Sequence, residues 1–249
     1  MAGRRSRLAW LRRCREELED EQAKVEAADA ENLRWRAEWE AEHGRKLGGR
    51  KPFPPDPDGL AKRQINTTDP DSRKIVRTGK TVQGYNAQAV ATAGQIILAA
   101  DITQQSNDSG ELEPMIVTAL EQLDRAGVHE RPETVLADGG YWNSSQIIAL
   151  GERGLQVIVP TRSAVRTTKR TLSPRQGPQA ERIDALLATR SGAALYRQRQ
   201  HIIETVFART KALRGITRFQ RRGLCACRAE WQLIATGHNL LKLHTALTG

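Results

Sequence analysis

The sequence predicts a mixed α/β fold in which strands are flanked by helices. Two observations support this fold class. Short β-like runs alternate with helical segments after residue 80. The chain has 249 residues, of which 39% are hydrophobic, and this is enough for one core of ordinary size or one core and an appendage. A long charged segment precedes the alternating part.

The segment Arg4–His43 is rich in Arg and Glu and contains no Gly or Pro, which predicts one long charged helix. Apolar residues recur every seven positions at Leu11, Leu18 and Val25, but the interleaved positions, Glu21 among them, form a poor second seam. We therefore expect a helix that lies against the core or a partner, and not a stable coiled coil.

Glycines at positions 44, 48 and 49 end this helix, and Lys51–Gly59 (KPFPPDPDG) reads as a proline-rich linker. The predicted domain organisation is a charged helical segment at 1–47, a proline-rich linker and turn at 48–80, and an α/β core at 81–249.

The predicted core begins with a hairpin and continues with alternating helices and strands. Its elements, in order, are the hairpin strands Val82–Thr92 and Gln95–Thr103, the helix Gly110–Ala126, the strand Thr134–Ala137, the helix Ser144–Arg153, the strand Gln156–Val159, a basic loop at 160–178, and the helices Tyr196–Leu213 and Ala229–Leu247. The hairpin turn falls at Ala93 and Gly94.

The positive charge is concentrated in one part of the chain. Between Arg162 and Arg222 there are 15 Lys and Arg against three acids, whereas the whole chain carries a net charge of +10. Such a field favours a polyanion, and nucleic acid is the commonest one. A solvated basic surface is the alternative. An RNA-binding module is less supported, because no RRM, KH or zinc-knuckle pattern is present.

Other compositional signals exclude several classes. The three cysteines, Cys14, Cys225 and Cys227, lack the second pair that a zinc site needs, and we expect reduced thiols. No apolar run is long enough to cross a bilayer, and no signal peptide follows the basic N-terminus. We therefore expect a cytoplasmic, nucleoid-associated protein with no membrane partner.

Two carboxylates form the candidate metal site. Asp138 ends a short apolar run that reads as a buried strand, and Glu204 lies inside a basic amphipathic helix. Hard oxygen ligands favour Mg²⁺, with Mn²⁺ as a substitute, and one shared ion requires the two carboxylates to lie about 4–7 Å apart. Asp101, at the end of the second hairpin strand, is a further candidate ligand, although an Asp there often caps a turn.

Several short blocks resemble one known family. They are NTTDPDSR at 66–73, GYNAQAV at 84–90, LADGGYW at 136–142, YRQRQHIIETVF at 196–207 and HNLLKL at 238–243. In this order they resemble the DDE transposases of bacterial insertion sequences, and the resemblance covers residues 48–243. It implies a ribonuclease-H-like catalytic domain, in which a mixed sheet is flanked by helices.

The resemblance implies roles for particular residues. Asp138 matches the second catalytic Asp, and Glu204 matches the catalytic Glu of a pattern that includes Tyr196, Arg199 and Lys211. The first catalytic Asp has no counterpart, because the family places its strand ahead of a helical insertion like 4–43. The fold is therefore expected to be incomplete at its first strand.

Further residues are expected at a DNA interface. Arg199 and Lys211 either grip phosphates or only solvate their helix. Trp142 either stacks on a displaced base or packs in the core. Tyr196, Arg221 and Arg222 complete the predicted interface within the basic segment.

The function that the resemblance implies is DNA transposition by metal-dependent strand cleavage and transfer, with transposon ends as the partner. A chain without the first Asp is expected to be inactive alone. It then needs a separate N-terminal transposase fragment, and it can assemble as a homo-oligomer. The alternative is a non-enzymatic DNA-binding protein, a regulator or remnant of a transposase.

Overall fold

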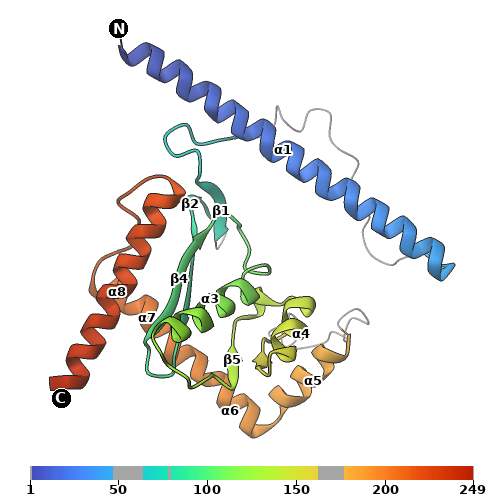
Figure 1. The fold of residues 1–249 in the computed structure, drawn as a ribbon, viewed down its shortest axis with the longest axis vertical. Coiled ribbons are helices and arrows are strands. Elements are labelled where there is room, and N and C mark those ends of the chain that lie inside the picture. Colours follow the sequence, from blue (N-terminus) through green and yellow to red (C-terminus); the bar gives the residue numbers. More distant parts are fainter. Residues whose placement is uncertain (1, 47–63, 78–79, 162–176, 249) are drawn as a thin grey trace. The chain divides into compact units, whose positions relative to one another are not determined.

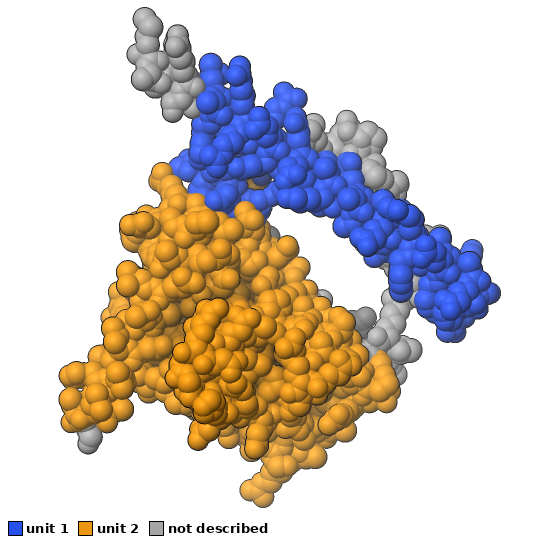
Figure 2. Space-filling model, viewed as in Figure 1, with its two compact units in different colours: residues 1–73 blue, residues 74–249 orange. Residues whose placement is uncertain are grey.

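The computed structural model describes residues 2–46, 64–77, 80–161 and 177–248. The chain divides into two compact units, residues 1–73 and residues 74–249 (Figure 2). The first unit holds the charged helix, and the second holds nearly all of the strands and the remaining described helices (Figure 1). None of the described helices combines the length and the apolar character that crossing a bilayer requires.

The charged segment forms one helix, α1 (Ala2–His43), as its composition predicts. Neither of its faces is continuously apolar, so ion pairs spaced four residues apart support it. One such pair joins Arg15 to Glu19 at 2.8 Å. Gly44 follows with a φ of +61°, the left-handed conformation that commonly ends a helix.

The predicted hairpin is present in the second unit. Its strands are β3 (Asn86–Ala91) and β4 (Ile97–Thr103), and they pair antiparallel. The register sets Gln88 opposite Asp101, so these two side chains lie on the same face of the hairpin. Gln95 adopts a φ of +64° in the connecting turn.

The first hairpin strand is shorter than predicted, because the run Val82–Thr92 is divided at Tyr85. The residues before Tyr85 form β2 (Lys80–Gly84), which pairs with β1 (Arg73–Arg77) in a separate sheet. The sequence did not predict β1, because a strand with basic residues at both ends is defined by its pairing and not by an apolar run.

A second pair of core strands agrees with its prediction to within a residue. Here β5 (Thr134–Leu136) and β6 (Gln156–Ile158) lie parallel, and α4 (Ser144–Glu152) forms the crossover between them. Crossover helices are the usual connection between parallel strands, because a short turn cannot join them.

The described strands form three two-stranded sheets, and not the complete mixed sheet that was expected. Side-chain packing links β3 to β5 instead of backbone hydrogen bonds. Val90 of β3 packs against the cluster that contains Val135 of β5 and also against the cluster that contains Ala99 of β4. The architecture is therefore mixed α/β, with both strand pairs of the core sharing one apolar interior.

Helices cover both faces of the β3–β4 hairpin (Figure 1). On one face lies α3 (Leu112–Arg125), whose Met115 packs against β4. On the other lies α8 (Leu224–Thr248), whose Trp231 packs against Ile102. Both helices were predicted, although α8 starts earlier than expected.

The residues between positions 190 and 213 form one continuous helical run. It consists of α6 (Arg190–Arg199), the π turn η2 (Gln200–Glu204), α7 (Thr205–Ala208) and the π turn η3 (Arg209–Leu213). The run starts before the predicted Tyr196, because the Thr189 hydroxyl accepts a hydrogen bond from the Gly192 N–H at 3.0 Å and caps the helix.

Two predicted segments fall outside the described residues. They are the linker Lys51–Gly59 and most of the basic loop at 160–178. The helix that follows this loop, α5 (Gly177–Ala188), was not predicted. It packs Ile183 into the core cluster that also holds Val135.

Candidate metal and DNA site

Asp138 lies just beyond the carboxyl end of β5, where the strand turns into the short helix η1 (Gly139–Tyr141). Its Oδ1 accepts a hydrogen bond from the Gly139 N–H at 2.7 Å, so the carboxylate caps this turn. The residue is exposed. A carboxylate with one fixed oxygen and an exposed position can still offer oxygen to a cation.

Glu204 closes the π turn η2 of the helical run. Its Oε1 lies 3.3 Å from Nη2 of Arg199, and 58% of its side chain is exposed. Residues five positions apart face each other when a turn is widened to a π turn, which explains why this pair forms at i, i+5. The ion pair is therefore a product of local helix geometry.

Tyr196 contacts both the strand end before Asp138 and the arginine that pairs with Glu204. Its hydroxyl donates to the backbone oxygen of Ala137, the residue before Asp138, at 3.3 Å. Burial raises the pKa of Tyr196, the Arg199 guanidinium opposes this shift, and the negative charges of Asp138 and Glu204 add to it. Tyr196 is therefore in contact with the residue before Asp138 and with Arg199, the ion-pair partner of Glu204.

Arg199 is largely withdrawn from solvent, with 17% of its side chain exposed. Its guanidinium lies over the Tyr196 ring at 5.7 Å. Its Nε is buried without a hydrogen-bond partner among the described residues. The predicted phosphate-binding arginine is thus held beside Glu204, with one donor still unsatisfied.

Asp101 has a different neighbour from the one that a metal role requires. Its carboxylate forms an ion pair with Arg228 of α8 and accepts a hydrogen bond from the Ile102 N–H at 2.7 Å. Within the described residues, no three His, Cys, Asp or Glu side chains come together in a way that could hold a metal ion. A role for Asp101 as a metal ligand stays a prediction.

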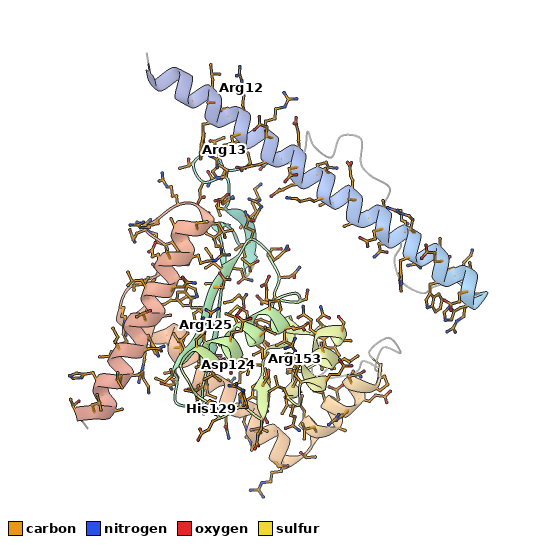
Figure 3. All side chains as sticks on the ribbon, viewed as in Figure 1. Arg12, Arg13, Asp124, Arg125, His129 and Arg153 are labelled. Atoms are coloured by element: carbon orange, nitrogen blue, oxygen red, sulfur yellow. The ribbon has the colours of Figure 1, made fainter. Side chains whose placement is uncertain are left out.

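Basic residues in two parts of the second unit differ in how they are paired. Near α3 and α4, Arg125 pairs with Glu121 at 3.7 Å, and Arg153 lies 4.0 Å from Glu113 (Figure 3). In the described residues between 177 and 222, by contrast, Arg199–Glu204 is the one ion pair that a Lys or Arg forms. The positive charge of that segment is therefore mostly uncompensated.

The remaining predicted interface residues lie along this segment. Lys211 is exposed on η3, with its Nζ 5.4 Å from the centre of the Phe207 ring. Arg221 and Arg222 are exposed in the loop before α8, where Glu230 accepts the Arg221 N–H at 2.9 Å. Glu230 also accepts the Gln220 N–H at 2.9 Å, so this side chain fixes the loop backbone.

Trp142 is partly buried and packs against the core cluster around Val135. This contact supports the core alternative that the sequence left open, and stacking on a base stays a prediction. Tyr141, one residue earlier, is also partly buried there.

Sequence reasoning missed Asp108, which lies beside the Asp138 turn. Its Oδ1 accepts hydrogen bonds from Asn86 Nδ2 at 2.6 Å and from Gln88 Nε2 at 2.8 Å. A carboxylate in the polar stretch Gln104–Gly110 resembles any turn residue, so no local pattern distinguishes it. Two amides on alternate positions of one strand were the available signal.

Comparison with known proteins identifies the family. The pattern of the family described as Transposase DDE domain matches residues 54–240, well over half of the chain. Neither a curated protein nor a solved structure matches. Proteins with this domain generally use divalent metal ions and act on transposon ends. The chain belongs to the transposase DDE domain family, and its function is related to DNA transposition.

Proposed function

We propose that the second unit binds one Mg²⁺ or Mn²⁺ between Asp138 and Glu204, at a surface that holds transposon-end DNA for strand cleavage and transfer. The observation that carries this proposal is the shared neighbour of the two carboxylates. Tyr196 donates to the backbone oxygen of the residue before Asp138, and its ring lies under Arg199, the partner of Glu204.

The donor set fits a hard divalent cation only in part. Both carboxylates are exposed oxygen donors, the type that Mg²⁺ prefers, and Mg²⁺ keeps several waters when a site supplies few anions. Arg199 holds Glu204 through an ion pair that a cation must compete with. A bound ion supplies activation of the attacking water or hydroxyl and stabilises the leaving oxygen.

The basic segment supplies the DNA surface in this proposal. Lys211, Arg221 and Arg222 are exposed, and each can meet a phosphate without breaking an ion pair. Arg199 can bind a phosphate only after its ion pair with Glu204 breaks. Because Glu204 is a proposed metal ligand, we assign Arg199 to a phosphate next to the scissile bond. Trp142 stacks on a base only if it leaves the core.

We infer that this polypeptide does not cut transposon DNA on its own. In this proposal the ion has two anionic ligands, Asp138 and Glu204, and the described residues hold no group of three acidic or other metal-binding side chains. Two anions anchor Mg²⁺ less firmly than three, and the reaction needs the ion placed on the scissile phosphate. A separate transposase fragment that supplies a further carboxylate is the partner that this inference requires.

A nicking assay tests the catalytic part of the proposal. The full chain is incubated with Mg²⁺ or Mn²⁺ and DNA that carries the element's own ends, with Asp138→Ala as control. We expect no cleavage by the chain alone. Cleavage that Asp138→Ala abolishes would overturn the inactivity, and it would point to another acid, with Asp101 the first to test.

A second function is favoured by the ion pair between Asp101 and Arg228, which occupies the other candidate ligand. In this alternative the chain is a non-enzymatic regulator that occupies transposon ends. The two functions separate when an N-terminal transposase fragment is added. Restored cleavage supports the split enzyme, and unchanged inactivity with tight end binding supports the regulator.

DNA binding is tested by its salt dependence. If about six cations meet phosphates, log K falls with log salt at a slope of about −5. Replacing Arg221 and Arg222 by Ala should reduce this slope by about 2. The matched control replaces Arg125 and Arg153 by Ala, since these two arginines already pair with acids. A slope near zero in the wild type rejects the phosphate surface.

A further inference from the structure

Two buried amides on β3 converge on one carboxylate outside the proposed site. Asn86 and Gln88 are 5% and 2% exposed, and both donate to Oδ1 of Asp108, at 2.6 Å and 2.8 Å. Buried polar side chains are retained where their hydrogen bonds are made, and a carboxylate acceptor makes such bonds stronger. Asp108 is therefore held to the hairpin by side chains at two alternate positions of β3.

The direction of each hydrogen bond in this network follows from the donor inventory. The Asp108 carboxylate can only accept, so Gln88 must present its Nε2 to it. The Gln88 oxygen Oε1 is then directed to the Tyr141 hydroxyl, which donates to it. Burial raises the pKa of Tyr141, and the charges of Asp108, Glu111 and Asp138 add to this shift, which keeps the phenol protonated as a donor.

Tyr141 belongs to the turn that Asp138 begins. Its backbone N–H donates to the backbone carbonyl oxygen of Asp138 at 2.9 Å. One short turn therefore links the position of the Tyr141 hydroxyl to the position of Asp138. Gly140, the residue before Tyr141, lies so close to Asp108 that an added Cβ would be 3.2 Å from Asp108 Oδ2. Gly140 of this turn thus lies beside Asp108, and Asp108 is linked to the turn by hydrogen bonds through Gln88 and Tyr141.

A second set of contacts ties the two loops together. Asn143 Nδ2 donates to the Ser109 oxygen at 2.9 Å, and Gln146 Nε2 donates to the Gly110 oxygen at 2.8 Å. The loop before α3 is therefore connected to the segment that follows Asp138 at three consecutive positions, Asp108 to Gly110. Such a network restricts the position of the turn more than any single bond does.

We propose that Asp108, acting through Gln88 and Tyr141, is a positioning residue that holds the Asp138 carboxylate in place for its metal ion. This inference rests on the proposed metal site. Outer contacts of this kind orient a metal ligand and set its affinity, and removing one typically costs about 10–100-fold in metal affinity.

The test, made in the full chain, moves the carboxylate from position 108 to position 88 in two steps. Gln88→Glu places a carboxylate against Asp108, and Asp108→Asn removes the acceptor charge. The double variant restores a donor facing a carboxylate, because Asn at position 108 can donate to Glu at position 88, which still accepts from Tyr141. The readout is the Mn²⁺ dissociation constant, measured from the signal of unbound Mn²⁺ in electron paramagnetic resonance.

We expect Gln88→Glu to weaken Mn²⁺ binding at least about fivefold, and Asp108→Asn to weaken it less, because the Asn oxygen can still accept from both amides. The double variant should return to within about twofold of the wild type. Tyr141→Phe removes only the hydroxyl, and it provides the milder variant if a charged substitution prevents folding. Thr236→Val is the control. It removes a hydroxyl of α8 that donates to the Gln232 backbone oxygen at 2.9 Å, on a helix that packs against β4, and it should leave Mn²⁺ affinity unchanged.

Two outcomes overturn the inference. Unchanged Mn²⁺ affinity in the single variants and in Tyr141→Phe, while Asp138→Ala weakens it, removes Asp108 from the site but leaves the site intact. Loss of affinity that the double variant does not recover shows a general packing defect. Asp138→Ala distinguishes the proposed function itself, because unchanged Mn²⁺ binding in that variant rejects the metal site and the inference with it.

Discussion

The turn that carries Asp138 and the helix that carries Glu204 differ in how firmly they hold their carboxylates. The Asp138 turn is tied to β3 by Tyr141, and the segment after it is tied to the loop before α3 by Asn143. The Glu204 carboxylate is held by one ion pair on an exposed π turn. For the proposed metal site, the comparison gives one fixed anchor, Asp138, and one adjustable anchor, Glu204, and we propose that a metal ion or DNA can reorganise the second without disturbing the first.

The largest expected effect comes from breaking the start of the helix that carries Glu204. In Gly192→Ala an added Cβ would overlap the Leu186 carbonyl oxygen and lie 2.8 Å from its carbon. Backbone of α5 cannot move aside cheaply, so we expect a loss of about 3 kcal/mol and a melting temperature lower by about 6–12 °C. Thermal unfolding followed by circular dichroism measures it.

The control for this variant is Gly237→Ala, at a glycine of α8 where an added Cβ meets nothing within 4 Å. It should raise stability by about 0.5–1 kcal/mol, because Gly weakens a helix interior relative to Ala. Equal melting temperatures for the two variants contradict the assigned packing between α5 and α6.

A smaller effect is expected from breaking the fixed anchor at Gly140. In Gly140→Ala the new Cβ lies 3.2 Å from Asp108 Oδ2, and the two amides on β3 limit how far that carboxylate can move. We expect a loss of about 1–2 kcal/mol together with weaker Mn²⁺ binding. Gly151→Ala, in open space on α4, should change neither quantity unfavourably.

Releasing the adjustable anchor should have the opposite effect on metal binding. Arg199→Met keeps most of the buried stem and removes the charge that pairs with Glu204. An ion pair with one exposed member contributes only about 0–1 kcal/mol, and Glu204 is 58% exposed, so stability should change little, while Mn²⁺ affinity without DNA rises about two- to fivefold. Arg199→Lys keeps the charge and should show a smaller rise. Weaker Mn²⁺ binding in Arg199→Met would show that Arg199 supports the metal site instead of competing for it.

The smallest expected effect appears at alkaline pH. The pKa of Tyr141 is raised above its ordinary value of 10.0, chiefly by burial, so the folded state retains a proton that the unfolded state releases. Its contribution to stability is present below pH 10 and falls as pH rises further, at up to about 1.4 kcal/mol per pH unit. Urea unfolding of Tyr141→Phe between pH 9 and 11 should show a shallower loss than the wild type. If the unfolding free energy falls with pH at the same slope in both proteins, Tyr141 does not have a raised pKa in the folded state.

The local patterns that the sequence shows clearly are the ones that predicted the fold. The helix α1, the strands β5 and β6 and the helix α4 follow from composition, apolar runs and turn residues within each segment. The division of the run at 82–92 and the helix α5 depend on contacts with distant residues, which no local window contains.

The candidate site divides in the same way. Asp138 at a strand end and Glu204 on a helix were predicted from position, and the structure has Asp138 directly after β5 and Glu204 in η2, while their role as metal ligands stays a prediction. The pairing of Arg199 with Glu204 was not predicted, because an α-helix sets residues three or four positions apart side by side and the π turn widens this to five. The contacts of Asp108 span the hairpin and the turn, so only the folded chain reveals them.

The most direct test of the central claim is the Mn²⁺ dissociation constant across a double-mutant cycle of Asp138→Ala, Glu204→Ala and their combination. If one ion is shared, each single variant loses most of the binding, and the double variant loses little more than either, so the effects in log units are far from additive. Additive losses, or unchanged affinity in Glu204→Ala, would show that the two carboxylates do not share a metal ion.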